Sequence, residues 1–146
     1  MKTVTSKTLL TAIFILVFST VSFSQTIGKI FSKEEADKLF GDVIESTSMS
    51  LCDFISNINQ TQNYVMFKEN NGELIILGDG RKVLYPVGKK VEPEEVFALF
   101  SKSIVVELLC LSSGDKITVE KRKEHLTVTY GLNTLEFAEW CPPNCP

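Results

Sequence analysis

Six short β-prone runs, arranged as two groups of three, constrain the fold of this chain more than any other feature of its sequence. In the first group the runs are separated by turns at 70–72 and 79–80, which contain Asn, Asp and Gly and so tolerate the positive φ of tight hairpins. Each group predicts a three-stranded antiparallel meander. The runs are residues 64–69, 73–77 and 81–85, and then 117–121, 126–130 and 134–140.

Two helices are expected before the first meander. Ser32 and Glu35 have the spacing of a capping box, and the apolar residues after them keep helical spacing as far as Gly41. A β-prone stretch follows at 43–49, and then four apolar residues recur at i, i+3, i+4 and i+7, which predicts a second helix that ends near Gln60. The residues of this stripe are Leu51, Phe54, Ile55 and Ile58.

The region between the meanders permits two interpretations. Pro93 and the two glutamates after it form a favourable helix start, and residues 96–112 either continue that helix or form a strand followed by a new helix. The elements together predict an α+β fold with helices packed on antiparallel meander sheets. Apolar positions recur 52 residues apart, as Val65 and Ile117 do, so residues 43–86 and 95–138 are expected to be pseudo-repeats within one domain.

The N-terminus has the parts of a secretory signal. Lys2 and Lys7 form a positively charged segment before a short apolar run, and small residues follow where a signal peptidase reads, with cleavage expected after Ser24. The apolar run is shorter than the ~20 residues that a membrane-spanning helix needs, and no later stretch approaches that length. Residues 1–24 are therefore expected to be a signal peptide, and residues 25–146 a single secreted or periplasmic domain without a membrane span.

The charge balance argues against a nucleic-acid partner. The chain has 15 Lys+Arg and 18 Asp+Glu, and removal of Lys2 and Lys7 leaves 13 against 18, a formal charge of −5. Nucleic-acid binding requires a basic surface that neutralises phosphates. The basic cluster at 121–123 falls at an expected hairpin tip, where a solvated turn accounts for it.

Alternation along the strands predicts which side chains share a face. In the second meander the residues between the apolar positions are polar, which predicts a solvated face. In the first meander both faces are apolar, and the outer one is expected to be covered by the helix at 31–40, by the second meander, by a protein partner or by an apolar ligand. The predicted solvated face is Thr118, Glu120, Arg122, His125, Thr127, Thr129, Thr134 and Glu136. The candidate binding residues are Tyr64, Met66, Ile75, Leu77 and Leu84, together with Trp140.

The residue patterns predict no catalytic, metal or cofactor site. His125 is the sole histidine and falls on a polar strand face, away from any predicted nucleophile. The adjacent acids at 34–35 and 94–95 point about 100° apart on a helix, and acids are common at helix starts. No glycine-rich loop precedes a helix in the manner of a phosphate-binding loop.

The four cysteines are expected to be oxidised in an exported protein. Cys141 and Cys145 would close a short loop that needs a turn or a cis proline, with Cys52–Cys110 as the complementary bond. Crossed pairings would instead tie the C-terminal tail to the rest of the domain. Use of Cys141 and Cys145 as a redox site is a further alternative, although three residues separate them and no helix follows.

These observations predict an exported, non-catalytic binding or accessory protein that contacts a protein partner or an apolar ligand through the apolar sheet face. By architecture the chain resembles small exported modules built from repeated helix-plus-meander units, such as the β-lactamase-inhibitor-like and PepSY-like groups. That resemblance implies an exported inhibitor-like module as the alternative function. A thiol-disulfide active protein that uses Cys141 and Cys145 is the remaining alternative.

Overall fold

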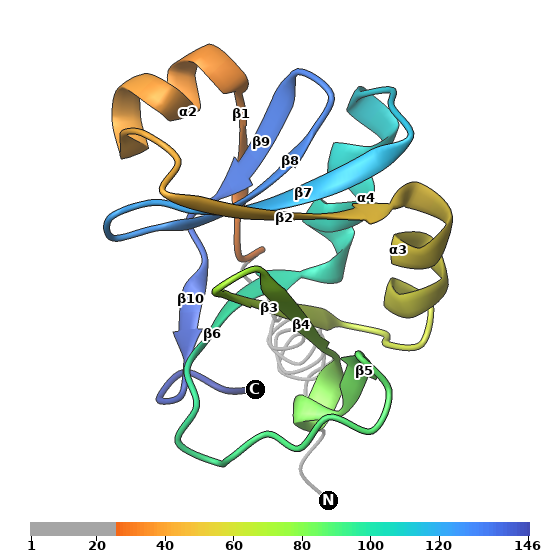
Figure 1. Ribbon diagram of the computed structural model, residues 1–146. Coiled ribbons are helices and arrows are strands. Elements are labelled where there is room, and N and C mark those ends of the chain that lie inside the picture. The colour runs from red at the N-terminus through yellow and green to blue at the C-terminus, as the bar shows by residue number, and fades with distance from the viewer. Residues whose placement is uncertain (1–25) are drawn as a thin grey trace, which may run out of the picture.

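The computed structural model describes residues 26–146 and shows an α+β fold in which two five-stranded antiparallel sheets and three helices pack together (Figure 1). The expected signal peptide, residues 1–24, lies outside the described residues. None of the helices in residues 26–146 is long and apolar enough to cross a membrane. The elements are β1 (Lys29–Ser32), α2 (Lys33–Phe40), β2 (Glu45–Ser50), α3 (Leu51–Ile58), β3 (Tyr64–Asn70), β4 (Glu73–Leu77), η1 (Asp79–Arg81), β5 (Val83–Tyr85), β6 (Phe97–Ser101), α4 (Lys102–Leu111), β7 (Lys116–Lys121), β8 (Leu126–Tyr130), β9 (Asn133–Glu136) and β10 (Glu139–Cys141).

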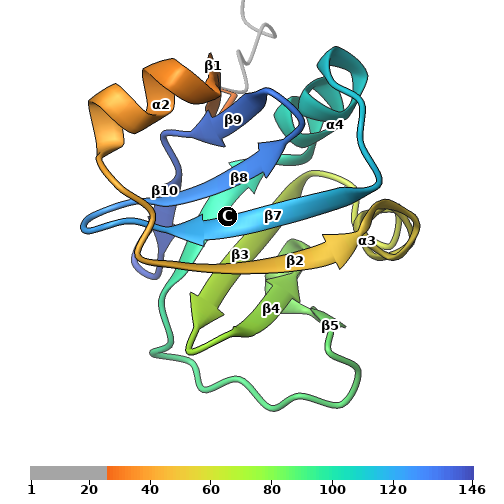
Figure 2. The same cartoon turned by 45° about the horizontal axis from the view of Figure 1, so that its top comes forward.

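The two sheets are built by exchange of strands between two halves of the chain. Sheet A has the order β1-β9-β8-β7-β2, and sheet B has the order β10-β6-β3-β4-β5. A strand, a helix and three more strands occur twice in succession, as β2-α3-β3-β4-β5 and β6-α4-β7-β8-β9. The leading strand of each series pairs with the first meander strand of the other, β2 with β7 and β6 with β3 (Figure 2). Neither series therefore completes its sheet alone.

The main hydrophobic core lies between the two sheets, with α3 and α4 at its side (Figure 2). Phe67 of β3 is fully buried there, and its ring stacks on that of Phe54 with 5.9 Å between centroids. Phe54 and Ile58 are the buried members of the predicted α3 stripe, whereas Ile55 is exposed. The apolar stripe thus holds α3 against the strands, as its spacing predicts.

Residues 96–112 form a strand followed by a helix. All five residues of β6 are buried, and this strand lies between β3 and β10 in sheet B. The expected helix start at Pro93 is wrong, because residues 93–96 form a turn and coil that lead into β6. Strand β6 is buried on both faces and paired on both edges, so its backbone hydrogen bonds are satisfied within the sheet. This stabilisation outweighs the local preference for a helix.

Helix α2 begins at the predicted capping box. The Ser32 hydroxyl accepts a hydrogen bond from the Glu35 N–H at 3.3 Å, and the Glu35 carboxylate accepts one from the Ser32 N–H at 3.0 Å. The Ser32 hydroxyl also donates to the Glu35 carboxylate at 2.8 Å, and the backbone and side-chain hydrogen bonds that this carboxylate accepts from Ser32 lower the pKa of Glu35. The helix ends at Gly41, whose φ of 78° favours glycine.

The prediction of a solvated face on the second meander is wrong. Helix α2 lies over that face of sheet A (Figure 1), and Arg122, Thr127 and Thr134 are at most 1% exposed. The polar groups satisfy one another: Arg122 donates to Asp37 of α2 at 2.9 Å, to Glu120 at 3.0 Å and to a backbone carbonyl after the helix. Strand parity identifies residues that do share a face, but polarity alone does not show whether water or a helix covers them.

Candidate binding groove between the sheets

The structure divides the predicted binding residues between two environments. Met66, Ile75 and Leu77 lie on the outer face of sheet B and are at most 4% exposed. They form a second core cluster with Phe97, Leu99 and Cys141. Segments of the same chain complete the cluster, because Ile27, Tyr64, Val83 and Val91 pack against it. Neither of the two expected elements covers this outer face. The helix at 31–40 packs on sheet A, and the second meander lies across the opposite face of sheet B.

Leu84 is separated from the other predicted residues. It belongs to the main core between the sheets, and its neighbour Val83 contacts the outer cluster instead. The pairing of β4 with β5 shifts register between Ile76 and Leu77. A register shift of this kind reverses the faces of the residues beyond it, which strict alternation could not predict.

Trp140 is the one strongly exposed member of the predicted set, with 42% of its surface accessible. The run at 134–140 is not one strand: β9 ends at Glu136, Phe137 has a φ of 64°, and β10 then joins sheet B. Trp140 pairs with Ala98 at the edge of that sheet. Because neighbouring strand residues point to opposite faces, Cys141 enters the buried outer cluster while Trp140 points the other way.

A groove of about 360 Å³ opens beside Trp140 between the two sheets. Its apolar lining comes from Phe67 and Leu126, which belong to the core, and from Trp140 and Val96, which are exposed. The polar lining comes from β3 and from the hairpin that joins β7 to β8. These polar residues are Lys68, Glu69, Asn70, Lys121, Arg122, Lys123, Glu124 and His125.

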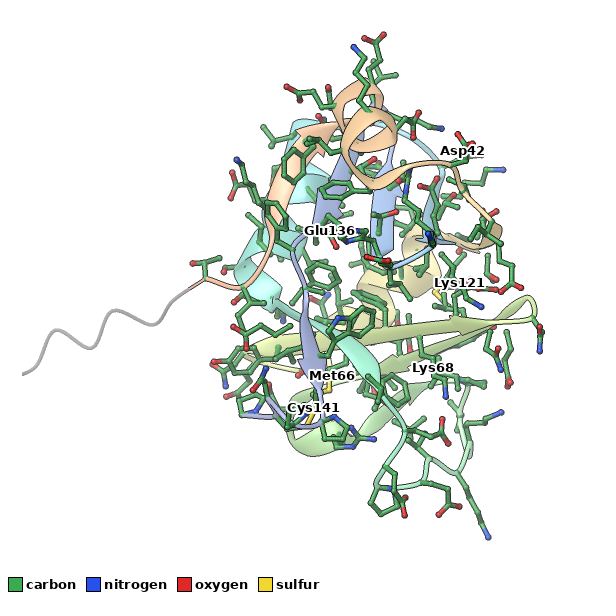
Figure 3. The ribbon with its side chains drawn as sticks, turned by 90° about the vertical axis from the view of Figure 1, so that its left-hand side faces the viewer. Asp42, Met66, Lys68, Lys121, Glu136 and Cys141 are labelled. Atoms are coloured by element: carbon green, nitrogen blue, oxygen red, sulfur yellow. A yellow bond between two sulfur atoms is a disulfide. The ribbon has the colours of Figure 1, made fainter. Side chains whose placement is uncertain are left out.

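Lysines stand on both sides of this groove (Figure 3). Lys68 donates to Glu95 at 2.6 Å, and this hydrogen bond is the main cause that lowers the pKa of Glu95. Lys121 donates to Glu45 at 3.1 Å and in the same way lowers the pKa of Glu45. Lys123 is exposed at the hairpin tip. Exposed ion pairs contribute little stability, so these lysines define the charge of the rim more than they hold the fold.

Glu69 is a buried acid on the β3 side of the groove, with 4% of its surface exposed. Its Oε1 accepts hydrogen bonds from the Gly72 N–H at 2.9 Å and from the Thr47 hydroxyl at 3.3 Å. Its Oε2 has no N–H or O–H donor among the residues that the structure describes.

His125 takes part in packing and in a hydrogen bond. Its Nδ1 lies 2.8 Å from a carboxylate oxygen of Glu136, and its ring lies 4.8 Å from the ring of Phe40. Within residues 26–146 no group of three or more His, Cys, Asp or Glu side chains is arranged to hold a metal ion. The groove therefore offers apolar contact, charge and hydrogen bonding, which are the properties of a binding surface.

The predicted short disulfide is present between Cys141 and Cys145, with 4.8 Å between the Cα atoms. The prediction of a complementary disulfide between Cys52 and Cys110 is wrong, because both thiols are free and exposed. Cys52 lies on α3 and Cys110 on α4, each on the solvent side of a helix whose apolar side packs on the sheets. The crossed pairings are excluded by the same observation.

Sequence reasoning missed most of the groove. Val96 falls in the segment that permits two interpretations, and the sequence pattern identifies Lys68 and Glu69 only as strand residues. The basic cluster at 121–123 and the exposed tryptophan are visible signals, but only the exchange of strands brings β3 and the β7–β8 hairpin together. Comparisons with protein-family models, with curated proteins and with solved structures found no match for this chain.

Proposed function

We propose that this protein is an exported binding protein whose groove receives an apolar side chain of a protein partner, with acidic residues beside that side chain. The observation that supports this most directly is the joint exposure of Trp140 and Val96, 42% and 45%, in one groove with lysines on both sides. Half-exposed tryptophans beside a concave surface are typical of residues that dominate binding energy in interfaces.

The charge of the groove favours an acidic partner segment. The whole chain has a formal charge of −3, yet the exposed or half-exposed charges of the groove are Lys68, Lys121 and Lys123 against Glu124. Glu45 and Glu95 already pair with two of these lysines, which leaves Lys123 as the most available charge. An exposed cation beside an apolar groove favours an acidic group on the partner and sets the orientation in which that partner docks.

Export is the second part of the proposal, and it rests on the predicted signal at residues 1–24. The Cys141–Cys145 disulfide is compatible with an oxidising compartment. Expression of the full chain in a bacterium with an intact secretion system should give a periplasmic or released protein that begins at Gln25. Mass spectrometry of the intact product measures this directly, and a cytoplasmic product that retains residues 1–24 would contradict export.

Selection from a phage-displayed library of random peptides tests the groove directly. Peptides that carry an aromatic or aliphatic residue next to Asp or Glu should be enriched. Trp140→Ala should lower the affinity of the selected peptides at least about tenfold, which corresponds to a loss of ~1.4 kcal/mol of binding free energy. Lys123→Glu should weaken them several-fold, and the effect should shrink at high salt.

Two variants serve as matched controls. Leu132→Ala removes an apolar side chain that is 80% exposed and lies outside the groove, and Lys38→Glu reverses an exposed charge on α2. Neither should change peptide affinity. Equal binding by Trp140→Ala and by the unchanged protein would overturn the proposal. A second outcome would also overturn it: no acidic peptide is enriched, but a fluorescent naphthalene sulfonate binds the unchanged protein and not Trp140→Ala. The ligand of the groove would then be a small apolar molecule.

A further inference from the structure

The disulfide is in direct contact with a positively charged side chain. Nη1 of Arg81 lies 3.5 Å from Sγ of Cys141 and 4.0 Å from Sγ of Cys145, and it donates to the carbonyl of Cys141 at 3.2 Å. A cation in this position stabilises the thiolate that leaves when the disulfide opens.

Arg81 is held in this position by several independent contacts. Its Nη2 donates to the backbone carbonyls of Glu92 at 3.2 Å and Glu95 at 2.8 Å. Its guanidinium group lies over the ring of Phe97, 5.2 Å from the centroid. The charge is therefore fixed beside the sulfur atoms before any reaction, so no reorganisation is needed when a thiolate forms there.

The two sulfur atoms differ in access. Cys141 is fully buried in the outer cluster of sheet B, whereas Cys145 is exposed. Cys145 also lines a hollow of about 260 Å³, together with Tyr64, Leu99 and Glu139. A thiolate from outside can thus reach Cys145, and the buried Cys141, which is the sulfur closer to Arg81, would be the leaving group.

We propose that Cys141–Cys145 is a thiol-disulfide exchange site that oxidises dithiols of exported proteins. A partner thiolate attacks Sγ of Cys145, a mixed disulfide forms, and Cys141 leaves as a thiolate beside Arg81. The second partner thiolate then attacks the partner sulfur of the mixed disulfide, which leaves the partner oxidised and both Cys141 and Cys145 reduced. A low-molecular-weight disulfide such as oxidised glutathione takes up these two electrons and restores the bond. The groove and this site lie on opposite faces of β10, so the two proposals are independent.

Trapping with oxidised glutathione tests which protein sulfur forms the mixed disulfide, in a background where Cys52 and Cys110 are replaced by Ser. Cys141→Ser should form a stable mixed disulfide with oxidised glutathione at Cys145, detected as added mass. Cys145→Ser should react at least about tenfold more slowly, because Cys141 is buried. Equal rates for the two variants would refute the assignment of Cys145 as the sulfur that reacts with the partner.

Arg81→Met tests the role of the guanidinium in the same background. The rate at which reduced glutathione opens the disulfide should fall about tenfold, and the thiolate absorbance of the reduced protein should appear at higher pH. Arg81→Lys should recover part of both effects, and Lys82→Met, which removes an exposed neighbouring charge, should change neither. Where Arg81→Met fails to fold, Arg81→Gln, which also removes the charge but keeps hydrogen-bond donors, gives the comparison. Unchanged kinetics and titration in the folded neutral variant would reduce the disulfide to a structural bond.

The activity itself is measured on a reduced dithiol peptide in the presence of oxidised glutathione. The protein should accelerate oxidation of the peptide above the rate with oxidised glutathione alone, and Cys145→Ser should abolish the acceleration. No acceleration by the intact protein would overturn the proposed activity. Loss of peptide binding in the groove has no bearing on this result, so the two proposals fail separately.

Discussion

Single side chains decide how the loops of this fold are held, and Asp79 is the clearest case. Its carboxylate accepts hydrogen bonds from the backbone N–H groups of Gln62 at 2.8 Å, Asn63 at 3.1 Å and Tyr64 at 2.9 Å. Burial opposes ionisation of Asp79, but these hydrogen bonds outweigh it and lower its pKa. Asp79→Asn should therefore reduce the free energy of unfolding at pH 7 by about 2 kcal/mol, measured by urea denaturation.

The pH dependence of this contribution has a definite sign. The pKa of Asp79 is lower in the folded state than in the unfolded chain, so its stabilisation is present above the unfolded pKa of about 4 and is lost as pH falls through the folded value. The stability difference between the unchanged protein and Asp79→Asn should shrink in that acidic range. Asp42→Asn, at an exposed acid, is the control and should have little effect at any pH. A difference that grows on acidification would contradict the assigned hydrogen bonds.

At the scale of elements, helix α2 is held on sheet A by buried charge as well as by packing. Arg122 is fully buried and links Asp37 of the helix to Glu120 of β7. Arg122→Met should cost about 3–5 kcal/mol of unfolding free energy, because Glu120 would remain buried without its cation. Thermal unfolding followed by circular dichroism measures the loss. Lys123→Met, next in sequence but exposed, should change stability by less than about 0.5 kcal/mol.

The same elements show how far the sequence determines the structure. Local signals are sufficient for α2 and α3 and for the hairpins at Gly72 and Gly80, because capping, helical spacing and turn residues act within a few positions. The tertiary partners of these elements are not predictable in this way. A β-rich run at 97–101 is a strand only because β3 and β10 flank it, and the groove depends on β3 meeting the β7–β8 hairpin. Such contacts join distant segments and leave no periodic pattern in the sequence.

For the whole molecule, the exchange of leading strands has a consequence for cooperativity. β2 comes from the first series and completes sheet A, while β6 comes from the second and completes sheet B. Unfolding of either series would remove its leading strand from one sheet and its three meander strands from the other. The main core lies between the sheets and contains residues of both. The described residues should therefore unfold as one cooperative unit, in which damage to one sheet lowers the stability of the other.

Two core substitutions test this cooperativity. Ile76→Ala lies in sheet B and Leu135→Ala in sheet A, and both side chains are fully buried. Each should lower the free energy of unfolding by about 2–5 kcal/mol. In each variant the midpoint in urea should be the same for Trp140 fluorescence, which reports on the edge of sheet B, and for hydrogen exchange of the β8 amides, which reports on sheet A. If Leu135→Ala moved only the β8 midpoint and left the fluorescence midpoint unchanged, the two sheets would be independent units. We do not expect that outcome, because the main core lies between the sheets, and loss of sheet A would expose the core side chains of sheet B to water.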